Sequence, residues 1–438
     1  MARLNELSAG EIAVRVAARG ITAEEVVGDC VARIAAREPQ IHAFAHVDPE
    51  LALEQARELD RRPVRGALHG IPIGIKDVID TADQPTQMGS PIYAGHRPAC
   101  DAACVAVLRA AGAIILGKTV TAEFAGMTAG PTVNPHNPAH TPGGSSSGSA
   151  AAVADLMLPV ALGTQTGGSV LRPAAYCGVI GYKPTFGAFN RAGLKFAAES
   201  LDTIGLMARS LDDIALITSV LLGGRNIRAF TPVFAGYGAP VGLDAAPRIG
   251  LCRTPLWDTA QPETKHAVED AGAQLAKAGA QLRDVTLPDD FAGLKAAARE
   301  TINNYERSKS MAAEWASHRD LISPKLQRCI ALGMDMPHQD YLAAIALGES
   351  CRARLPAIFE GFDILLAPCV QGEAPVGLDS TGDPGFQAIW TILHVPALTL
   401  PTHRGPNGLP VGIQLIGRRY DDQRLFACAK WVWERLAS

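Results

Sequence analysis

Two glycine-serine stretches decide how this chain folds: Gly143-Gly144-Ser145-Ser146-Ser147-Gly148-Ser149 and Thr164-Gln165-Thr166-Gly167-Gly168-Ser169. A lysine precedes them at the end of the apolar run Ile71-Pro72-Ile73-Gly74-Ile75-Lys76. Glycine-serine composition is typical of flexible linkers, but a periodic apolar stretch at 150–160 follows the first one directly, as at the start of a helix. The two stretches therefore predict ordered loops within a folded core.

The residue types in these loops suit acyl chemistry that uses serine and lysine. A serine hydroxyl needs a base within hydrogen-bond reach, and donors for the oxyanion that forms when it attacks a carbonyl. Glycine-rich backbone at 166–169 can turn successive N–H groups toward one point. Lysine can act as the base only if its pKa falls several units from about 10.4. We expect Ile71, Ile73 and Ile75 to supply the apolar surroundings that lower it.

A set of motifs carries a resemblance to a known family. They are 70–77 (GIPIGIKD), 117–125 (GKTVTAEFA), 137–149 (NPAHTPGGSSSGS), 163–169 (GTQTGGS), 181–185 (GYKPT) and 408–417 (GLPVGIQLIG). In this order and at this spacing they resemble the amidase signature family, over most of the chain. The resemblance implies an α/β fold with a single large mixed β-sheet flanked by helices, and a helical insertion.

The resemblance also implies roles for individual residues. Ser169 would be the nucleophile, Lys76 the terminal base and Ser145 the serine that relays the proton between them. The peptide bond Gly144–Ser145 would be cis. The oxyanion hole would consist of Thr166, Gly167 and Gly168, and the substrate-binding residues would include Arg172, Gly143, Gly144 and Ser146. No cofactor and no metal is expected.

Two positions depart from the commonest family pattern. Gln165 stands where many members have aspartate, which leaves the hydrogen bonding of the oxyanion loop open. Many members have arginine two residues after the nucleophile, whereas here that position is Leu171 and arginine follows at Arg172. This segment resembles the malonamidase branch, which implies that Arg172 receives a substrate carboxylate in its planar fork. The alternative, an internal salt bridge on a helix N-terminal turn, remains open.

The expected activity is hydrolysis of a small, carboxylated, malonamate-like amide to an acid and ammonia or an amine. Hydrolysis of a carbamate or an aryl amide by the same three residues is an alternative. A further alternative is the amidase component of a transamidation complex, which would pass ammonia to a partner. A non-catalytic binding module is disfavoured, because all three catalytic side chains are present.

Composition limits the kinds of partner and the cellular location that we expect. Charged residues make up 19% of the 438 residues, apolar residues 47%, and the net charge is −4, so neither nucleic acid nor a membrane surface is an expected partner. The first residues carry charges and lack a secretory signal, and the nine scattered cysteines predict free thiols. These features favour a cytoplasmic protein. Size leaves monomer and homodimer open, with the homodimer favoured.

Three other patterns are rejected as functional sites. The segment 112–119 has the spacing of a phosphate-binding loop, but its interior Ala-Ile-Ile-Leu predicts a buried strand. His96, Cys100 and Cys104 could share a helix face and bind zinc, but Pro98 places the helix start near Asp101. Neither Ser145 nor Ser169 lies in a Gly-x-Ser-x-Gly elbow, so no histidine is assigned to a triad.

Hydrophobic periodicity predicts one domain over 1–438. It is divided into an N-terminal helical layer (1–60), a catalytic core (61–222), a smaller strand-helix and helical cap region (223–360) and a return to the core sheet (361–438). Expected helices are 8–19, 22–37, 49–60, 101–111, 149–155, 211–222, 262–278, most of 291–359 and 421–436. Expected strands are the Lys76 segment, 113–117, 158–163, 248–252, 281–286, 363–367, 398–400 and 411–416. The Gly/Pro-rich stretch 223–247 is expected to be a connection.

Overall fold

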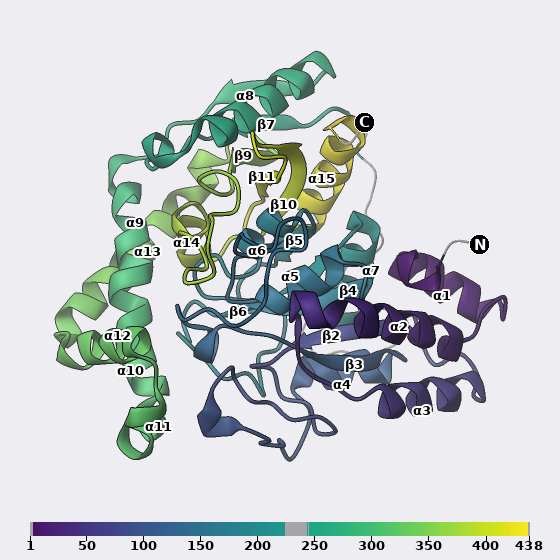
Figure 1. The fold of residues 1–438 in the computed structure, drawn as a ribbon. Coiled ribbons are helices and arrows are strands. Elements are labelled where there is room, and N and C mark those ends of the chain that lie inside the picture. Colours follow the sequence, from purple (N-terminus) through teal and green to yellow (C-terminus); the bar gives the residue numbers. More distant parts are fainter. Residues whose placement is uncertain (1–2, 224–242, 244, 437–438) are drawn as a thin grey trace.

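The computed structural model describes residues 3–223, 243 and 245–436. Within them one mixed sheet of eleven strands, in the order β1-β3-β2-β4-β6-β5-β10-β11-β9-β7-β8, runs through the molecule with helices packed around it (Figure 1). The single-sheet α/β architecture expected from the sequence is therefore confirmed.

The strand order places the ends of two parallel strands together. The strands are β1 (Phe44–Val47), β2 (Pro72–Lys76), β3 (Ile114–Thr119), β4 (Val160–Gln165), β5 (Ile180–Lys183), β6 (Thr203–Ala208), β7 (Arg248–Leu251), β8 (Gln281–Asp284), β9 (Ile364–Pro368), β10 (Ala397–Arg404) and β11 (Pro410–Ile416). Strand β2 pairs in parallel with both β3 and β4. Because the carboxyl ends of parallel strands meet at one edge, Lys76 lies beside the loop that follows β4.

Helix starts follow local capping signals. The helices are α1 (Ala9–Ala17), α2 (Ala23–Ile41), α3 (Pro49–Asp60), α4 (Ala103–Ala110), α5 (Ser147–Ala154), α6 (Leu171–Cys177), α7 (Leu211–Leu221), α8 (Pro262–Lys277), α9 (Leu294–Ala296), α10 (Asn303–Ser310), α11 (Ala312–Ser317), α12 (Pro324–Asp335), α13 (His338–Ile358), α14 (Gly385–Ile392) and α15 (Asp422–Leu436). Capping boxes of Ser8 with Glu11 and of Thr22 with Glu25 begin α1 and α2. Within the segment expected to be mostly helical, prolines mark two helix starts, since α12 begins at Pro324 and α13 directly after Pro337.

The two faces of the sheet pack against different helices, because side chains alternate along each strand. Ile73 and Ile75 of β2 belong to one core, together with apolar residues of α4, α7, α8 and α15. Ala161 of β4 and Met207 of β6 belong to a second core, with residues of α5, α6 and α14. Helices α2 and α3 bury a third set against β3. Helices α9 to α13 form a column beside the sheet (Figure 1).

Several elements were not expected from the sequence. They are β1, β5, β6, α6 and α14. All eight residues of α14 are buried, so the helix lacks the solvent-exposed polar face that marks a surface helix. The segment 223–247, expected to be a connection, lies mostly outside the described residues.

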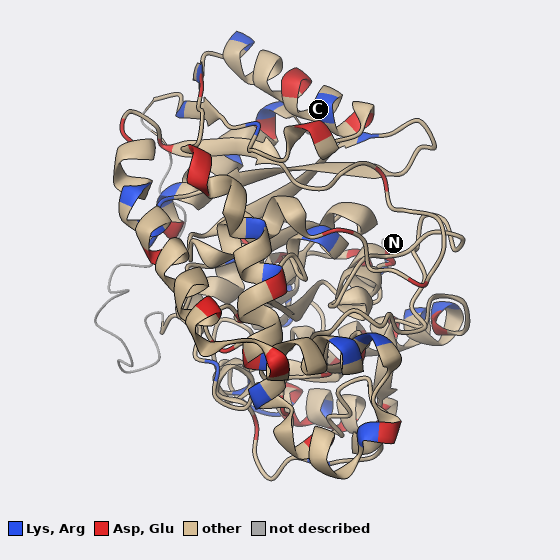
Figure 2. Cartoon of the chain, turned by 90° about the vertical axis from the view of Figure 1, so that its left-hand side faces the viewer, with Lys and Arg blue, Asp and Glu red and all other residues tan. Residues whose placement is uncertain are grey.

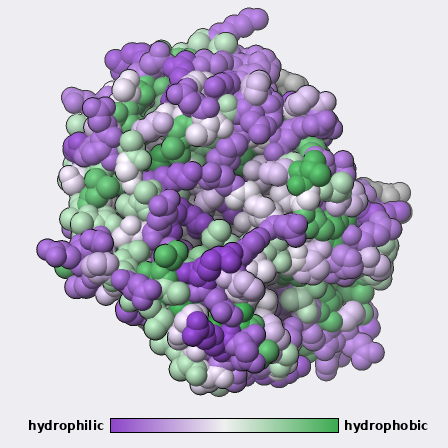
Figure 3. Space-filling model, turned by 60° about the vertical axis from the view of Figure 1, so that its left-hand side comes forward, coloured by the Kyte–Doolittle hydropathy of each residue, from purple (hydrophilic) through white to green (hydrophobic). Residues whose placement is uncertain are grey.

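The surface is mixed in charge and in hydropathy. Acidic and basic residues are interspersed along the helices in Figure 2. Apolar residues are scattered among hydrophilic ones on the face drawn in Figure 3. No helix among the described residues combines the length and the apolar character needed to cross a membrane.

Candidate active site

Three chain segments meet at the carboxyl end of β2. Lys76 is the last residue of this strand and is fully buried. Its Nζ donates a hydrogen bond to Ser145 Oγ (2.7 Å) and another to Thr164 Oγ1 (2.8 Å). Ser145 lies in the loop before α5, and Thr164 is in β4, which continues into the loop of Ser169. The lysine and the two serines singled out in the sequence thus lie on adjoining segments.

The environment of Lys76 favours the neutral amine. Burial lowers the pKa of Lys76 well below its ordinary value, Asp202 opposes this shift, and Arg307 and Arg172 add to it. A neutral amine at neutral pH can accept a proton from the hydroxyl that it contacts.

The expectation that Ile71, Ile73 and Ile75 surround Lys76 is wrong. Ile71, Ile73 and Ile75 pack in the core on the opposite face of the sheet. The physical reason is the alternation of side chains along β2, which turns Lys76 away from Ile73 and Ile75. Lys76 faces Ser145 and Thr164 instead, and is kept from water by the loop and strand that carry them.

The loop of Ser145 is anchored to β4. The Gly144–Ser145 peptide bond is cis, as expected. Ser146 Oγ accepts a hydrogen bond from Thr164 N (3.2 Å) and donates one to Thr164 O (3.3 Å). Gly143 has φ +79°, and a Cβ there would lie 2.9 Å from the backbone of the helix that follows Ser169. Gly143, Gly144 and Ser146 do not line the cavity described below, so their part in substrate binding stays a prediction.

The loop after β4 presents free donors. The N–H groups of Gly167, Gly168 and Ser169 form no hydrogen bond with any residue in the described part of the chain. The carbonyls of this loop are tied down, since Gly167 O accepts from Thr391 Oγ1 (2.7 Å) and Gly168 O accepts from Arg172 N (2.9 Å). Ser169 is 8% exposed and lines a cavity. Free N–H groups beside an accessible hydroxyl are what an attack on a carbonyl requires.

Gln165 stands where many family members have aspartate, and the structure shows which hydrogen bonds its side chain makes. Its Oε1 accepts hydrogen bonds from Val170 N (2.9 Å) and Leu171 N (3.1 Å). Its Nε2 donates to Thr391 Oγ1 (3.0 Å). The side-chain amide therefore spans the loop of Ser169 from strand to helix, with a donor and an acceptor both in use.

Asp202 is a member of this network that the sequence did not indicate. Its Oδ1 accepts from Thr166 Oγ1 (2.5 Å), and its Oδ2 accepts from the N–H groups of Ala197 and Ala198. Burial raises the pKa of Asp202 and these hydrogen bonds oppose the shift. No motif surrounds Asp202; the only sequence signal is an acid next to the apolar run of β6.

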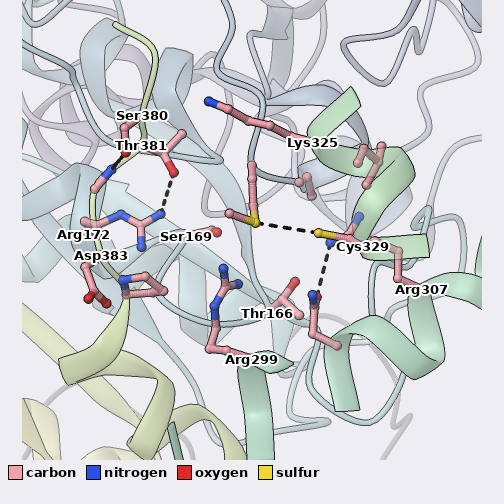
Figure 4. Close-up of a pocket in the computed structure, with 18 of the residues that line it drawn as sticks. Thr166, Ser169, Arg172, Arg299, Arg307, Lys325, Cys329, Ser380, Thr381 and Asp383 are labelled. Carbon is pink, nitrogen blue, oxygen red and sulfur yellow. Dashed lines mark hydrogen bonds between the residues drawn. The ribbon is translucent and has the colours of Figure 1, made fainter. Parts of the chain in front are cut away.

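A cavity of about 330 Å³ opens in front of Ser169 (Figure 4). Its basic wall residues are Arg172, Arg299, Arg307 and Lys325, and its acidic ones are Asp379 and Asp383. The helical column beside the sheet contributes Arg299, Arg307 and Lys325. The sequence motifs indicated Arg172 but not these three, because no motif falls within the helical segment.

Arg172 is buried with part of its guanidinium unused. Its Nη2 donates to Gly144 O (2.6 Å) and to Thr381 Oγ1 (3.1 Å). Its Nε and Nη1 are buried and have no hydrogen-bond partner among the described residues. Burial lowers the pKa of Arg172 to about 10, which keeps it charged at neutral pH. The alternative of an internal salt bridge finds no carboxylate within 4.0 Å in the described part of the chain.

The rejected patterns have structural roles. Residues of the segment 112–119 form the buried strand β3. His140 Nδ1 is 2.6 Å from Ala374 O, and His394 Nε2 is 2.9 Å from Ser200 O. Among the residues that the structure describes, no three side chains of metal-ligating type lie together.

Comparison with known proteins gives the family. Residues 25–426 match the profile of the Amidase family. This chain belongs to the Amidase family. It is accordingly a hydrolase that acts on amide C–N bonds, as its amidase structural neighbours also indicate.

Relatives and solved structures agree with this assignment. A glutamyl-tRNA(Gln) amidotransferase subunit of Chloroflexus aggregans is 36% identical over 469 aligned residues, covering 97% of this chain and 95% of the relative. The native peptide amidase of Stenotrophomonas maltophilia has a TM-score of 0.85 and 30% identity, covering 99% of this chain and 97% of that one. A 6-aminohexanoate cyclic dimer hydrolase has a TM-score of 0.87 and 25% identity, covering 99% and 98%. These relatives do not specify the malonamidase branch.

Proposed function

We propose that this amidase hydrolyses a small amide through an acyl-enzyme on Ser169, with Ser145 and Lys76 as the proton relay. The observation that carries the proposal is the 2.7 Å hydrogen bond between Lys76 Nζ and Ser145 Oγ, at a lysine whose pKa burial lowers well below its ordinary value. Such a lysine can take up a proton that a hydroxyl passes to it.

The reaction would proceed in two acyl-transfer steps. Ser169 Oγ attacks the amide carbonyl and its proton passes through Ser145 to Lys76, while N–H groups of the loop 166–169 stabilise the oxyanion. Lys76 then returns the proton through Ser145 to the departing amine. Water hydrolyses the acyl-enzyme with the same groups acting in reverse. No step calls for a cofactor.

For the substrate, we propose a small amide that carries a carboxylate, as in malonamate. The unused Nε and Nη1 of Arg172, which lines the cavity in front of Ser169, support this proposal. A guanidinium with free donors suits a carboxylate. None of the relatives described above is named for such a substrate, so the proposal rests on the cavity alone. A carbamate or an aryl amide remains the alternative within the same chemistry.

A second candidate is the amidase component of a transamidation complex. The Chloroflexus relatives, which are named as glutamyl-tRNA(Gln) amidotransferase subunits and are 36% identical over almost the whole chain, favour it. They support this candidate more strongly than they support a malonamate-like substrate. The candidate implies a protein partner that receives ammonia, whereas the first proposal implies a chain that is active alone, as a monomer or homodimer in the cytoplasm.

Ammonia release by the purified chain tests both candidates. The panel contains malonamate, its neutral diamide malonamide, glutamine and an aryl carbamate, each with the native protein and with Ser169→Ala. We expect the native chain to release ammonia without any partner protein. In Ser169→Ala the rate of ammonia release should fall by several orders of magnitude. Turnover retained in Ser169→Ala contradicts the proposed chemistry. Activity confined to glutamine, and only in a stable complex with other proteins, would favour the transamidation candidate.

A further inference from the structure

Arg299 is a cation without a partner in the wall of the cavity. It lies in a π-helical turn, η7 (Ala297–Ile302), between α9 and α10. Its side chain forms no hydrogen bond, and no ion pair within 4.0 Å, with another residue in the described ranges. The wide π-turn is a feature often found at functional sites. A half-buried guanidinium without a partner is costly, which points to a bound group that completes its hydrogen bonding.

The side chain of Arg299 lies against the loop that precedes Ser169. A Cβ built on Gly167 would be 3.1 Å from Arg299 Cδ and 3.4 Å from its Nη1. The guanidinium is thus next to the loop whose free N–H groups face the reacting carbonyl in the proposed mechanism. In Figure 4 it points from the helical column toward Ser169.

Arg172 approaches Ser169 from another side of the cavity (Figure 4). It is only 4% exposed, and its Nε and Nη1 lack partners among the described residues. The two arginines come from different layers, since Arg172 is in α6 of the sheet core and Arg299 in the helical column. Together they offer two guanidinium groups with free donors around one serine.

Other charged residues of the cavity wall have hydrogen-bond partners of their own. Arg307 is occupied, since its Nη1 donates to Phe124 O (2.8 Å) and its Nη2 to Asn303 Oδ1 (3.3 Å). The Asp383 carboxylate accepts from Lys295 Nζ (3.0 Å) and from Gly385 N (2.7 Å). Lys325 Nζ donates to Asp379 O (2.7 Å). Arg299 and Arg172 are therefore the basic wall residues whose guanidinium groups have donors without a partner among the described residues.

We propose that Arg299 and Arg172 clamp the carboxylate of the amide substrate, and that Arg299 sets the preference for a negatively charged acyl group. The inference rests on the proposed hydrolysis at Ser169. Two guanidinium forks can hold both oxygens of a carboxylate in place. A cavity of about 330 Å³ limits the substrate to a small molecule, so the substrate is a half-amide of a short dicarboxylic acid.

Kinetics on a matched substrate pair test the role of Arg299. Malonamate and the neutral malonamide are compared in the native enzyme, Arg299→Gln and Arg299→Lys. We expect kcat/KM for malonamate to fall about 10- to 100-fold in Arg299→Gln, mainly through KM, because a hydrogen bond to a charged group contributes about 1.5–3 kcal/mol. The kcat/KM for malonamide should change less than about 3-fold. Arg299→Lys should recover part of the loss on malonamate, because lysine keeps the charge but lacks the planar guanidinium fork.

A matched control is Arg328→Gln, which removes the same charge from an exposed position of α12 outside the cavity wall. It should leave the ratio of the two kcat/KM values unchanged. Equal losses on malonamate and malonamide in Arg299→Gln would overturn the proposal, since a merely structural role affects both. A shift of the ratio in Arg328→Gln as large as in Arg299→Gln would overturn it as well.

Calorimetric binding of malonate separates this inference from the proposed function. Ser169→Ala is compared with the double variant Ser169→Ala/Arg299→Gln, and neither measurement needs turnover. Affinity at least about 10-fold weaker in the double variant supports the clamp. Equal affinity, or no malonate binding to Ser169→Ala, overturns it. If the native chain hydrolyses no amide, the proposed function fails while malonate binding still decides the role of Arg299.

Discussion

Replacing Gln165 by methionine tests the loop of Ser169 by its stability. Methionine has a similar length but lacks the acceptor, so the buried N–H groups of Val170 and Leu171, 2.9 and 3.1 Å from Gln165 Oε1, lose their partner. Each orphaned buried N–H costs about 1–3 kcal/mol, so the loss is about 2–6 kcal/mol in total. The donor bond to Thr391 adds little, because Thr391 Oγ1 still donates to Gly167 O.

Urea unfolding measures this change directly, through the free energy of unfolding of the native chain and of Gln165→Met. The matched control is Gln165→Glu, which keeps an acceptor and should lose less stability than Gln165→Met. We also expect kcat/KM of Gln165→Met to fall about 10- to 100-fold, because small misplacements of a nucleophile are costly. A free energy of unfolding within about 0.5 kcal/mol of the native value would refute the reasoning.

Three further predictions concern the relay and the cavity. Ser145→Ala should lower kcat about 10²- to 10⁴-fold, as removal of a proton-transfer group does, with a near-unchanged thermal unfolding curve; a smaller loss would leave Ser145 outside the relay. Asp202→Asn removes the charge that raises the pKa of Lys76, so the acidic limb of the kcat/KM–pH profile should move to lower pH, and a shift to higher pH would contradict the account. Gly167→Ala should displace Arg299, which lies 3.1 Å from the added methyl, and lower kcat/KM for malonamate more than for malonamide; equal losses would speak against this.

The core of the fold was predictable because its signals are local. Glycine-rich loops at strand ends, capping residues such as Ser8 and Thr22, and the apolar run of β3 each act within a few residues. The helix α14 was missed because it is buried on all sides and so lacks the charged, solvent-facing side that marks a surface helix.

The candidate site was only partly predictable, since its walls come from distant segments. Lys76, Ser145 and Ser169 lie in motifs, but Arg299 stands 130 residues after Ser169, in a π-turn that has no sequence signature. The surroundings of Lys76 were misassigned because neighbours in sequence were taken as neighbours in space, whereas strand residues next to each other face opposite sides.

Trapping of the acyl-enzyme tests the central claim most directly. The native chain and Ser169→Ala are each mixed with an amide that the native chain hydrolyses, or with the corresponding ester. The mixtures are quenched in acid within milliseconds and digested for mass spectrometry. The account predicts an acyl mass increase on the peptide that contains Ser169, present in the native chain and absent from the variant. Acylation of any other residue, or an adduct that persists in Ser169→Ala, would contradict it.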